Sequence, residues 1–519
     1  MELKVFKSTI AAYGGKWETK LELPLETELL IPDYLPAVFK IVKCLIEPVI
    51  MQNNITAAHW QGEGYLRCTV YYQSDEAGTR LYRCDQKFPF EKSVELPSAN
   101  YVQGPARLWG EVEYSNCRAI SEHRIDLRGA YTLCVAALAV EPRELLTSLA
   151  DCGVEQRTMQ LDGESCTGAE EKTFTAKTTL SLPGTGETVL DISGSFAPQG
   201  YTVQTGQVNI KGSLTVQACY RPADAEELSV KTKEIPVQQT VELGGIAEGD
   251  TCCCWGRVLA CTLAAAEGAE DEPTLTITWA LHAELWRAQQ YMAVADAYST
   301  LCQTSVSKSS CRLLQKRAEL AETVNVVVED ELPDATARVK ACFVTLGGAQ
   351  ATQTQAEAAE GEQVAIVGKG TAHLLCADER GELTCYDKAF AWQLPQTFAA
   401  PAQDLWPQLT VAATKVNSGK NGDKMRVDLE IAVRGCVMQM QSYEVADAVE
   451  LGEEFPDKNE GPALYLYYAT QGERVFDIAK RYHARAKDLA AANHMEPTAG
   501  VPLQDMTSQG ACLLIPAAL

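Results

Sequence analysis

The sequence has no long hydrophobic run and lacks the short motifs of the common catalytic sites. No segment approaches eighteen consecutive apolar residues, so no transmembrane helix is expected. The first residues contain no apolar core of a secretory signal, which predicts a cytoplasmic protein in a reducing compartment. The motifs Gly-x-Ser-x-Gly, Gly-x4-Gly-Lys-Ser/Thr and His-Glu-x-x-His are all missing.

Side chains suited to catalysis or metal binding are present but not grouped. The six histidines are scattered, and acidic pairs such as Glu170-Glu171 are typical of a solvated face. The nineteen cysteines include no Cys-x-x-Cys pair, and adjacent strand residues such as Cys252, Cys253 and Cys254 face opposite sides. We therefore expect no catalytic residue, no cofactor and no metal site, and we expect most cysteines to be reduced thiols that serve as small apolar residues.

The chain is strongly acidic. Its 45 basic and 69 acidic residues give a net charge of −24 over 519 residues. Such a charge disfavours nucleic acid and anionic membrane surfaces as partners, and it favours solubility or a basic partner. The length predicts several domains, each large enough to bury its own core.

The body of the chain repeats at intervals of about 150 residues. One landmark is a glycine inside a segment that alternates apolar and polar residues, and another is a tryptophan before a short apolar stretch. They are Gly64, Gly212 and Gly370, and Trp109, Trp255 and Trp406. A third landmark, Val-Ala-Asp-Ala, occurs at residues 294–297 and 445–448. The repeat predicts three homologous units.

Each unit contains many short alternating segments separated by turns rich in glycine and proline. This pattern is typical of antiparallel β sandwiches, so the sequence predicts a mainly β fold. Examples of expected strands are residues 20–30, 125–136 and 203–210. Helices are expected only at 142–149 and 36–43 within the units.

The last segment has a different pattern. Tyr465 and Tyr467 alternate as in a half-buried strand, and Gly472 permits a following turn. One helical face then carries Val475, Ile478, Ala479 and Tyr482, and the last strand ends at Pro516. The segment resembles a LysM module, which implies a small α+β (βααβ) fold that binds rather than catalyses.

Two segments of the body resemble the SPOCS domain. Residues 30–36, Leu-Ile-Pro-Asp-Tyr-Leu-Pro, are similar to its opening, and residues 295–300, Ala-Asp-Ala-Tyr-Ser-Thr, to its end. Three SPOCS units followed by a LysM module are similar to the SipL-type spore-coat morphogenesis proteins. The expected boundaries are 1–160, 161–305 and 306–452 for three β-sandwich-like SPOCS units, 453–462 for an acidic linker and 463–519 for the LysM module.

The resemblance implies a non-catalytic sporulation scaffold made in the mother cell. Such a protein helps to attach the spore coat to the forespore surface, and its LysM module engages the morphogenetic ATPase of the basement layer. The alternative is a wall or cortex protein that binds peptidoglycan or N-acetylglucosamine through the same module.

The candidate binding residues lie in two turns of the module. They are Gly472, Glu473, Arg474, Val475, Phe476, Asn493 and Met495. Glu473 and Arg474 stand where glycan-binding modules have Asp-Thr, which favours a protein contact through an exposed Arg474 and Phe476 and the apolar segment 495–506. The other interpretation, that Arg474 is only solvated and Phe476 packs inward, stays open.

Overall fold

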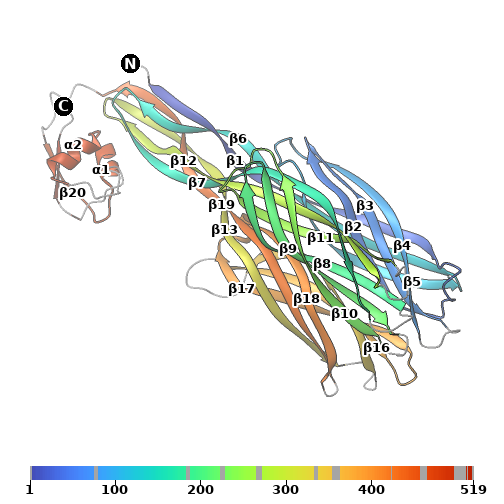
Figure 1. Cartoon of the computed structure of the whole chain (residues 1–519). Coiled ribbons are helices and arrows are strands. Elements are labelled where there is room, and N and C mark those ends of the chain that lie inside the picture. Colours follow the sequence, from blue (N-terminus) through green and yellow to red (C-terminus); the bar gives the residue numbers. More distant parts are fainter. Residues whose placement is uncertain are drawn as a thin grey trace.

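The computed structural model describes residues 3–74, 80–182, 188–222, 228–264, 272–331, 337–353, 363–421, 424–455, 464–495, 510 and 512–516. Most of these residues lie in β strands, which confirms the prediction of a mainly β protein. Figure 1 shows an elongated molecule with sandwiches at one end, long strands running toward the other end, and a small helical module beside the ends of these strands.

The first six strands form a β sandwich. They are β1 (Lys4–Leu30), β2 (Lys40–Thr56), β3 (His59–Gln73), β4 (Leu81–Glu95), β5 (Arg107–Ser121) and β6 (Arg124–Ala150). One sheet has the order β1-β6-β5 and the other the order β2-β3-β4. Their alternating apolar side chains, among them Trp60, Val70 and Leu127, meet in one core.

The next six strands repeat this arrangement. They are β7 (Val154–Thr179), β8 (Thr188–Gln204), β9 (Gln207–Arg221), β10 (Ser229–Glu242), β11 (Thr251–Ala264) and β12 (Thr274–Ser299). β12 pairs with both β7 and β11, and β9 pairs with both β8 and β10. The rings of Phe196 and Trp279 stack in the core with centroids 4.6 Å apart.

The third group of strands has the same order with one interruption. It contains β13 (Cys302–Glu331), β14 (Arg338–Leu346), β15 (Gln350–Gln353), β16 (Gln363–Ala377), β17 (Leu383–Ala399), the 3₁₀ turn η1 (Ala402–Asp404), β18 (Leu405–Asn421) and β19 (Lys424–Glu454). β14 and β15 together pair along β16, on the side opposite to β17. β13 also touches β7 through the pair Leu314–Glu164, which joins two of the sheets.

The repeated landmarks occupy corresponding strands. The three glycines lie in the middle strand of the outer sheet, in β3, β9 and β16, and the three tryptophans lie near the start of β5, β11 and β18. At Gly212 and Gly370 a Cβ atom would lie 2.5 Å from the rings of Phe196 and Phe390. Glycine is required at these two positions because a neighbouring aromatic ring covers the strand.

The strands are longer than the alternation predicts, and several sequence-based boundaries are wrong. The expected strand 203–210 is the β8–β9 hairpin, with Gly206 at a φ of 81° in its turn. The expected limits at 160 and 305 fall inside β7 and β13, and the expected linker start at 453 falls inside β19. Both expected helices are also wrong, because β2 begins at Lys40 and residues 142–149 belong to β6.

Residues 142–149 show why tertiary structure overrides helix propensity here. Leu145 packs in one apolar cluster and Leu146 and Leu149 pack in another, so the segment is buried on both faces. An extended strand paired with β1 presents alternate side chains to both clusters, whereas a helix would not.

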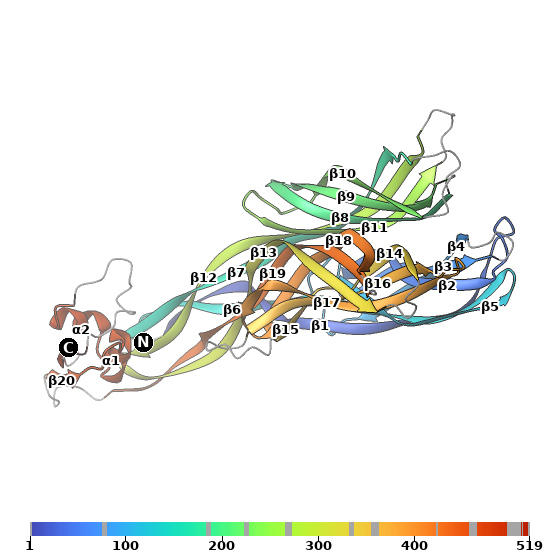
Figure 2. The same ribbon diagram turned by 90° about the horizontal axis from the view of Figure 1, so that it is seen from below.

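In each unit the first and last strands form a long pair, and the three pairs continue beyond the sandwiches and pack on one another. The outer parts of β1/β6, β7/β12 and β13/β19 share apolar clusters that contain Ile10, Leu161, Cys311, Val294 and Ala446. Figure 2 shows these strand pairs extending from the sandwiches as a common stalk. Each strand pair in the stalk is therefore covered by side chains of the other two pairs.

A second apolar cluster joins the three sandwiches where the stalk begins. Tyr13 and Leu138 come from the first unit, Trp286 from the second, and Trp406 and Met438 from the third. A disulfide between Cys253 and Cys436, which are 183 residues apart in the sequence, lies in the same cluster. The second and third units are therefore linked covalently as well as by apolar packing.

The chain ends in a small βααβ module. Its elements are β20 (Leu464–Tyr468), α1 (Val475–Arg481), α2 (Ala486–Ala492) and β21 (Cys512–Pro516). β20 and β21 form a two-stranded antiparallel sheet. The element order agrees with the sequence prediction, while residues 496–509, which include most of the predicted segment 495–506, lie outside the described residues.

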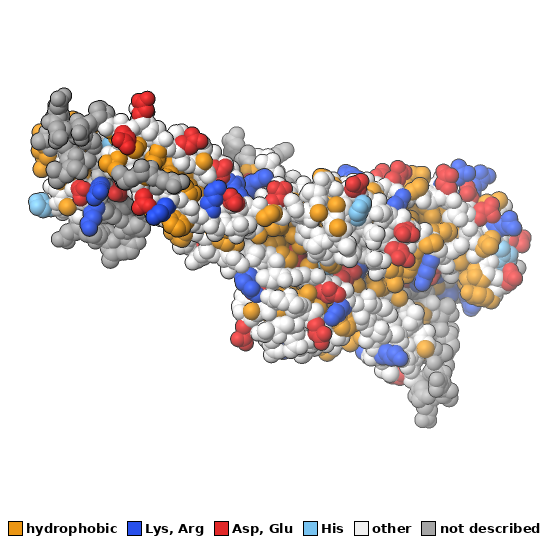
Figure 3. All heavy atoms as spheres, turned by 90° about the horizontal axis from the view of Figure 1, so that it is seen from above, with side chains coloured by type: hydrophobic (Ala, Val, Ile, Leu, Met, Phe, Trp, Pro, Cys, Tyr) orange, Lys and Arg blue, Asp and Glu red, His pale blue; other side chains and the backbone are white. Residues whose placement is uncertain are grey.

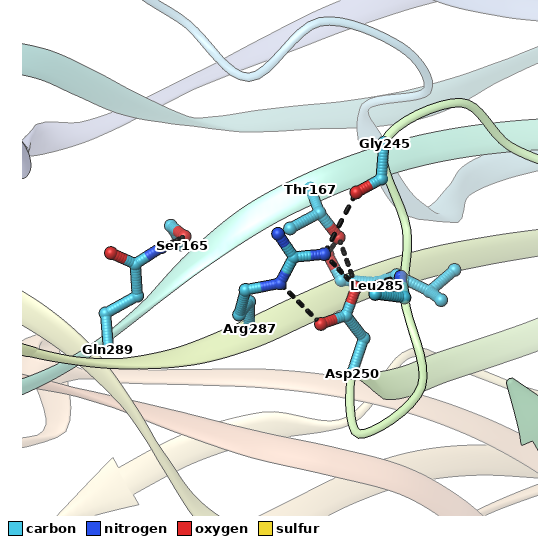
Figure 4. A network of polar contacts seen from close by, with 8 residues as sticks. Ser165, Thr167, Gly245, Asp250, Leu285, Arg287 and Gln289 are labelled. Carbon is cyan, nitrogen blue, oxygen red and sulfur yellow. Dashed lines mark hydrogen bonds and ion pairs between the residues drawn. The ribbon is translucent and has the colours of Figure 1, made fainter. Parts of the chain in front are cut away.

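A buried carboxylate fixes the loop between β10 and β11. Asp250 accepts hydrogen bonds from Arg287 Nε at 2.7 Å, Arg287 Nη2 at 2.8 Å and the Ala247 amide at 3.0 Å (Figure 4). The Thr167 hydroxyl lies 3.3 Å from the same carboxylate, and Arg287 also donates to the Gly245 carbonyl. The hydrogen bonds from Arg287 hold the pKa of Asp250 below its ordinary value.

Asp250→Asn should lower the Tm by about 2–4 °C at neutral pH, because the amide loses the ion pair with Arg287 while keeping the shape of the side chain. The folded-state pKa is depressed, so the stabilisation is present above about pH 4 and is lost as the pH falls below that value. Thermal unfolding from pH 7 to pH 2 should show the two proteins converging at low pH. The exposed Asp33→Asn is the control, and a constant offset at all pH values would contradict the prediction.

Thiol titration of the denatured protein without reductant should leave only Cys253 and Cys436 unreactive, because all other cysteines are free in the structure. Burial raises the pKa of thiols such as Cys68, to about 12, and Cys376, to about 11, so these should react slowly in the native protein. In Cys436→Ser, reductant should add no further thiols. A gain of several cysteine pairs on reduction of the unmodified chain would contradict this assignment.

Candidate interaction site

The turn between β20 and α1 is built by Gly472 and Glu473. Gly472 has a φ of 87°, a conformation that favours glycine, and its position is open to solvent. The carboxylate of Glu473 accepts hydrogen bonds from the Tyr467 hydroxyl at 2.9 Å, from Arg481 at 3.0 Å and from the Thr470 amide at 3.3 Å. Although burial raises the pKa of Glu473, the hydrogen bonds from Tyr467 and Thr470 lower it overall. Glu473 therefore fixes the turn from within the module.

Arg474, Val475 and Phe476 do not share one surface. Arg474 is exposed at the N-terminal boundary of α1, and its side chain makes no capping hydrogen bond. Val475 and Phe476 are only 0% and 1% exposed and belong to the module core. The expectation of an exposed Phe476 beside Arg474 is therefore wrong, because the first turn of α1 directs this ring inward.

Asn493 joins the end of α2 to β21. Its amide donates to the carbonyls of Leu489 at 2.8 Å and Leu514 at 2.7 Å, and its oxygen accepts from the Leu514 amide at 2.7 Å. Met495 is half-buried and packs against the same module core. These contacts give Asn493 and Met495 a structural position at the base of the second turn.

The sequence prediction did not identify the outer face of the β20-β21 sheet. Tyr465 and Tyr467 point toward α1, where both contact the ring of Tyr482. Leu464, Leu466, Tyr468 and Leu514 lie on the other face, and Leu466 and Tyr468 are 63% and 79% exposed. The signal was available in the sequence, because a strand whose outward positions are Leu, Leu and Tyr is apolar on both faces.

Figure 3 shows acidic and basic side chains interspersed over one side of the molecule. Some of these charges are paired across strands, as in Lys7–Glu144 at 2.9 Å and Arg426–Glu329 at 3.1 Å. Exposed pairs of this kind contribute little to stability.

One group of polar side chains has an arrangement used by hydrolases. Thr345 lies 3.0 Å from His373 Nε2, and His373 Nδ1 lies 2.8 Å from Asp387. Asp387 also pairs with Lys43 of the first unit, and its pKa falls to about 2 despite burial, because of the hydrogen bonds from His373 and Lys43. The group sits where β2 meets the β16-β17 sheet, so it ties the first unit to the third.

Metal and membrane sites were also considered. Within the described ranges, no three or more His, Cys, Asp or Glu side chains are grouped so that they could hold a metal ion. Neither of the helices seen in those ranges has the length and apolar character needed to span a membrane. Comparison with known proteins found no matching family model, no matching curated protein and no matching solved structure.

Phe476→Ala should destabilise the module by about 3–5 kcal/mol, because a buried ring is replaced by a cavity. Arg474→Ala should change its stability by less than about 0.5 kcal/mol, because the side chain is exposed. A denaturant titration followed by hydrogen exchange of the α1 and α2 amides would compare the two. Equal stability of both variants would contradict the inward packing of Phe476.

Proposed function

We propose that this chain is a non-catalytic scaffold of the sporulation apparatus, made in the mother cell and placed at the forespore surface within the spore coat. Its C-terminal module, proposed to be a LysM module, binds a protein of the coat basement layer, the morphogenetic ATPase. The proposal rests on the resemblance of the sequence to SPOCS units followed by a LysM module, and on one structural observation.

That observation is the apolar face of the β20-β21 sheet. Leu466 lies opposite Leu514, and Tyr468 lies opposite Cys512, so the exposed side chains form one continuous strip. Large exposed apolar and aromatic side chains that are grouped together are typical of protein interfaces. Gly472 and Arg474 in the neighbouring turn remain candidate contact residues, because both are exposed.

The charge distribution supports a protein partner. The segment from residue 464 onward carries as many basic as acidic side chains, so the net charge of −24 belongs to the rest of the chain. A neutral module with an apolar strip can approach an acidic or a neutral protein surface without the repulsion that the sandwiches would meet. Peptidoglycan stays the alternative ligand, because an exposed ring such as Tyr468 can also stack on a sugar.

The full-length chain should bind the purified ATPase, and Leu466→Glu with Tyr468→Ala should weaken binding at least about 30-fold, as expected when an interface centre is lost. Tyr34→Ala, which removes an 84% exposed ring far along the chain, is the matched control. Surface plasmon resonance would measure both variants, and co-sedimentation with purified peptidoglycan would be run in parallel. Strong sedimentation with peptidoglycan and no ATPase binding would favour the alternative.

A further inference from the structure

The three long strand pairs of the stalk differ at their outer ends, here called tips. The second ends in Asp296-Ala297-Tyr298, whereas the corresponding residues of the third are Asp447-Ala448-Val449. The first pair ends at Ala150, and the last residues of β6 include neither an aspartate nor a tyrosine. Any contact that requires both side chains is therefore available at one tip of the three.

The C-terminal module contacts this tip through an ion pair. Lys480 Nζ of α1 lies 2.7 Å from each carboxylate oxygen of Asp296. The Asp296 side chain is 13% exposed and that of Lys480 38%, so the carboxylate is largely shielded from water. In the third unit the corresponding Asp447 instead lies 3.6 Å from Arg143 of the first unit, so it is directed sideways within the stalk.

Tyr298 inserts into the module core. Its hydroxyl donates to the Ala484 carbonyl at 2.8 Å, and its ring meets Phe476 edge-on with centroids 5.1 Å apart. Tyr298 is 2% exposed and clusters with Val475, Ile478 and other residues of the module. A tyrosine at a strand end would be open to solvent without the module, so its burial depends on the docked arrangement.

The tip is itself rigid. The Ser299 hydroxyl donates to the Cys152 carbonyl at 2.6 Å, and the Thr300 amide donates to the Gly153 carbonyl at 2.9 Å. The chain leaving the third unit is held at the same place, because the Phe455 amide donates to Leu301 and its ring lies 4.2 Å from that of His483. The module is thus anchored from two directions.

We propose that Asp296-Ala297-Tyr298 is a docking site for the C-terminal module and holds it in one orientation at the end of the stalk. Docking covers Phe476 and pairs Lys480 with Asp296, and it leaves the apolar strip with Leu466 and Tyr468 exposed. An external partner therefore meets a preoriented strip rather than a freely tethered module, which lowers the entropic cost of binding. The docking is intramolecular and does not depend on the identity of the partner in the proposed function.

Carbodiimide treatment of the full chain tests the docking directly, because this reagent joins a carboxylate to an amine only when the two are in contact. Mass spectrometry should detect a cross-link between Asp296 and Lys480 and none between Asp447 and Lys480. Tyr298→Ala leaves both reacting groups in place, and it should lower the yield at least about fivefold. Absence of the cross-link in the unmodified chain, or an equal yield in Tyr298→Ala, would overturn the proposal.

Hydrogen exchange provides a second readout for milder variants. Asp296→Asn and Tyr298→Phe should each make the α1 amides exchange up to about tenfold faster, and Asp447→Asn is the matched control. The charge swap Asp296→Lys with Lys480→Asp should restore slow exchange, which separates loss of docking from misfolding. Exchange equal to that of the control in both single variants would also overturn the proposal, whatever the outcome of the ATPase and peptidoglycan assays.

Discussion

The pairing of the first strand of each unit with its last is the constraint on which the structure depends. β1 with β6, β7 with β12 and β13 with β19 each run antiparallel over most of their length. This pairing closes every sandwich, because the intervening strands must return to the edge from which they left. It also makes the stalk, because the paired strands continue past the sandwich and need another surface to cover their apolar side chains.

The shared stalk and junction explain the composition of the long strands. In β6, Leu133 and Val135 face the sandwich core, while Ala136 and Leu138 face the central cluster, so both faces are buried. A strand buried on both faces has no polar side and favours small residues where backbones approach closely. Buried cysteine serves as such a residue, as at Cys134 in β6.

The sequence predicted what depends on local pattern and on the repeat, and it failed where distant residues decide. Alternation and landmark spacing predicted the mainly β fold and corresponding positions for Trp109, Trp255 and Trp406. The pattern at 142–149 was misread as a helix, since the burial of this segment is determined by the strand pairs of the other two units. The packing of Phe476 likewise includes Tyr298, which is far away in the sequence. The same holds for Cys253 and Cys436, whose contact requires the second and third units to be assembled.

The asymmetry of the three tips follows from this repeated architecture. Three equivalent strand pairs would offer one module three equivalent docking sites. Its position would then be set only by the length of the connecting chain. Changing a pair of residues at one tip removes that ambiguity, because an ion pair and a buried aromatic ring are available at Asp296 and Tyr298 alone. The third strand pair also has an aspartate at this position, but Asp447 faces Arg143 within the stalk. A repeated fold can therefore acquire one specific intramolecular contact through side chains that differ among its repeats.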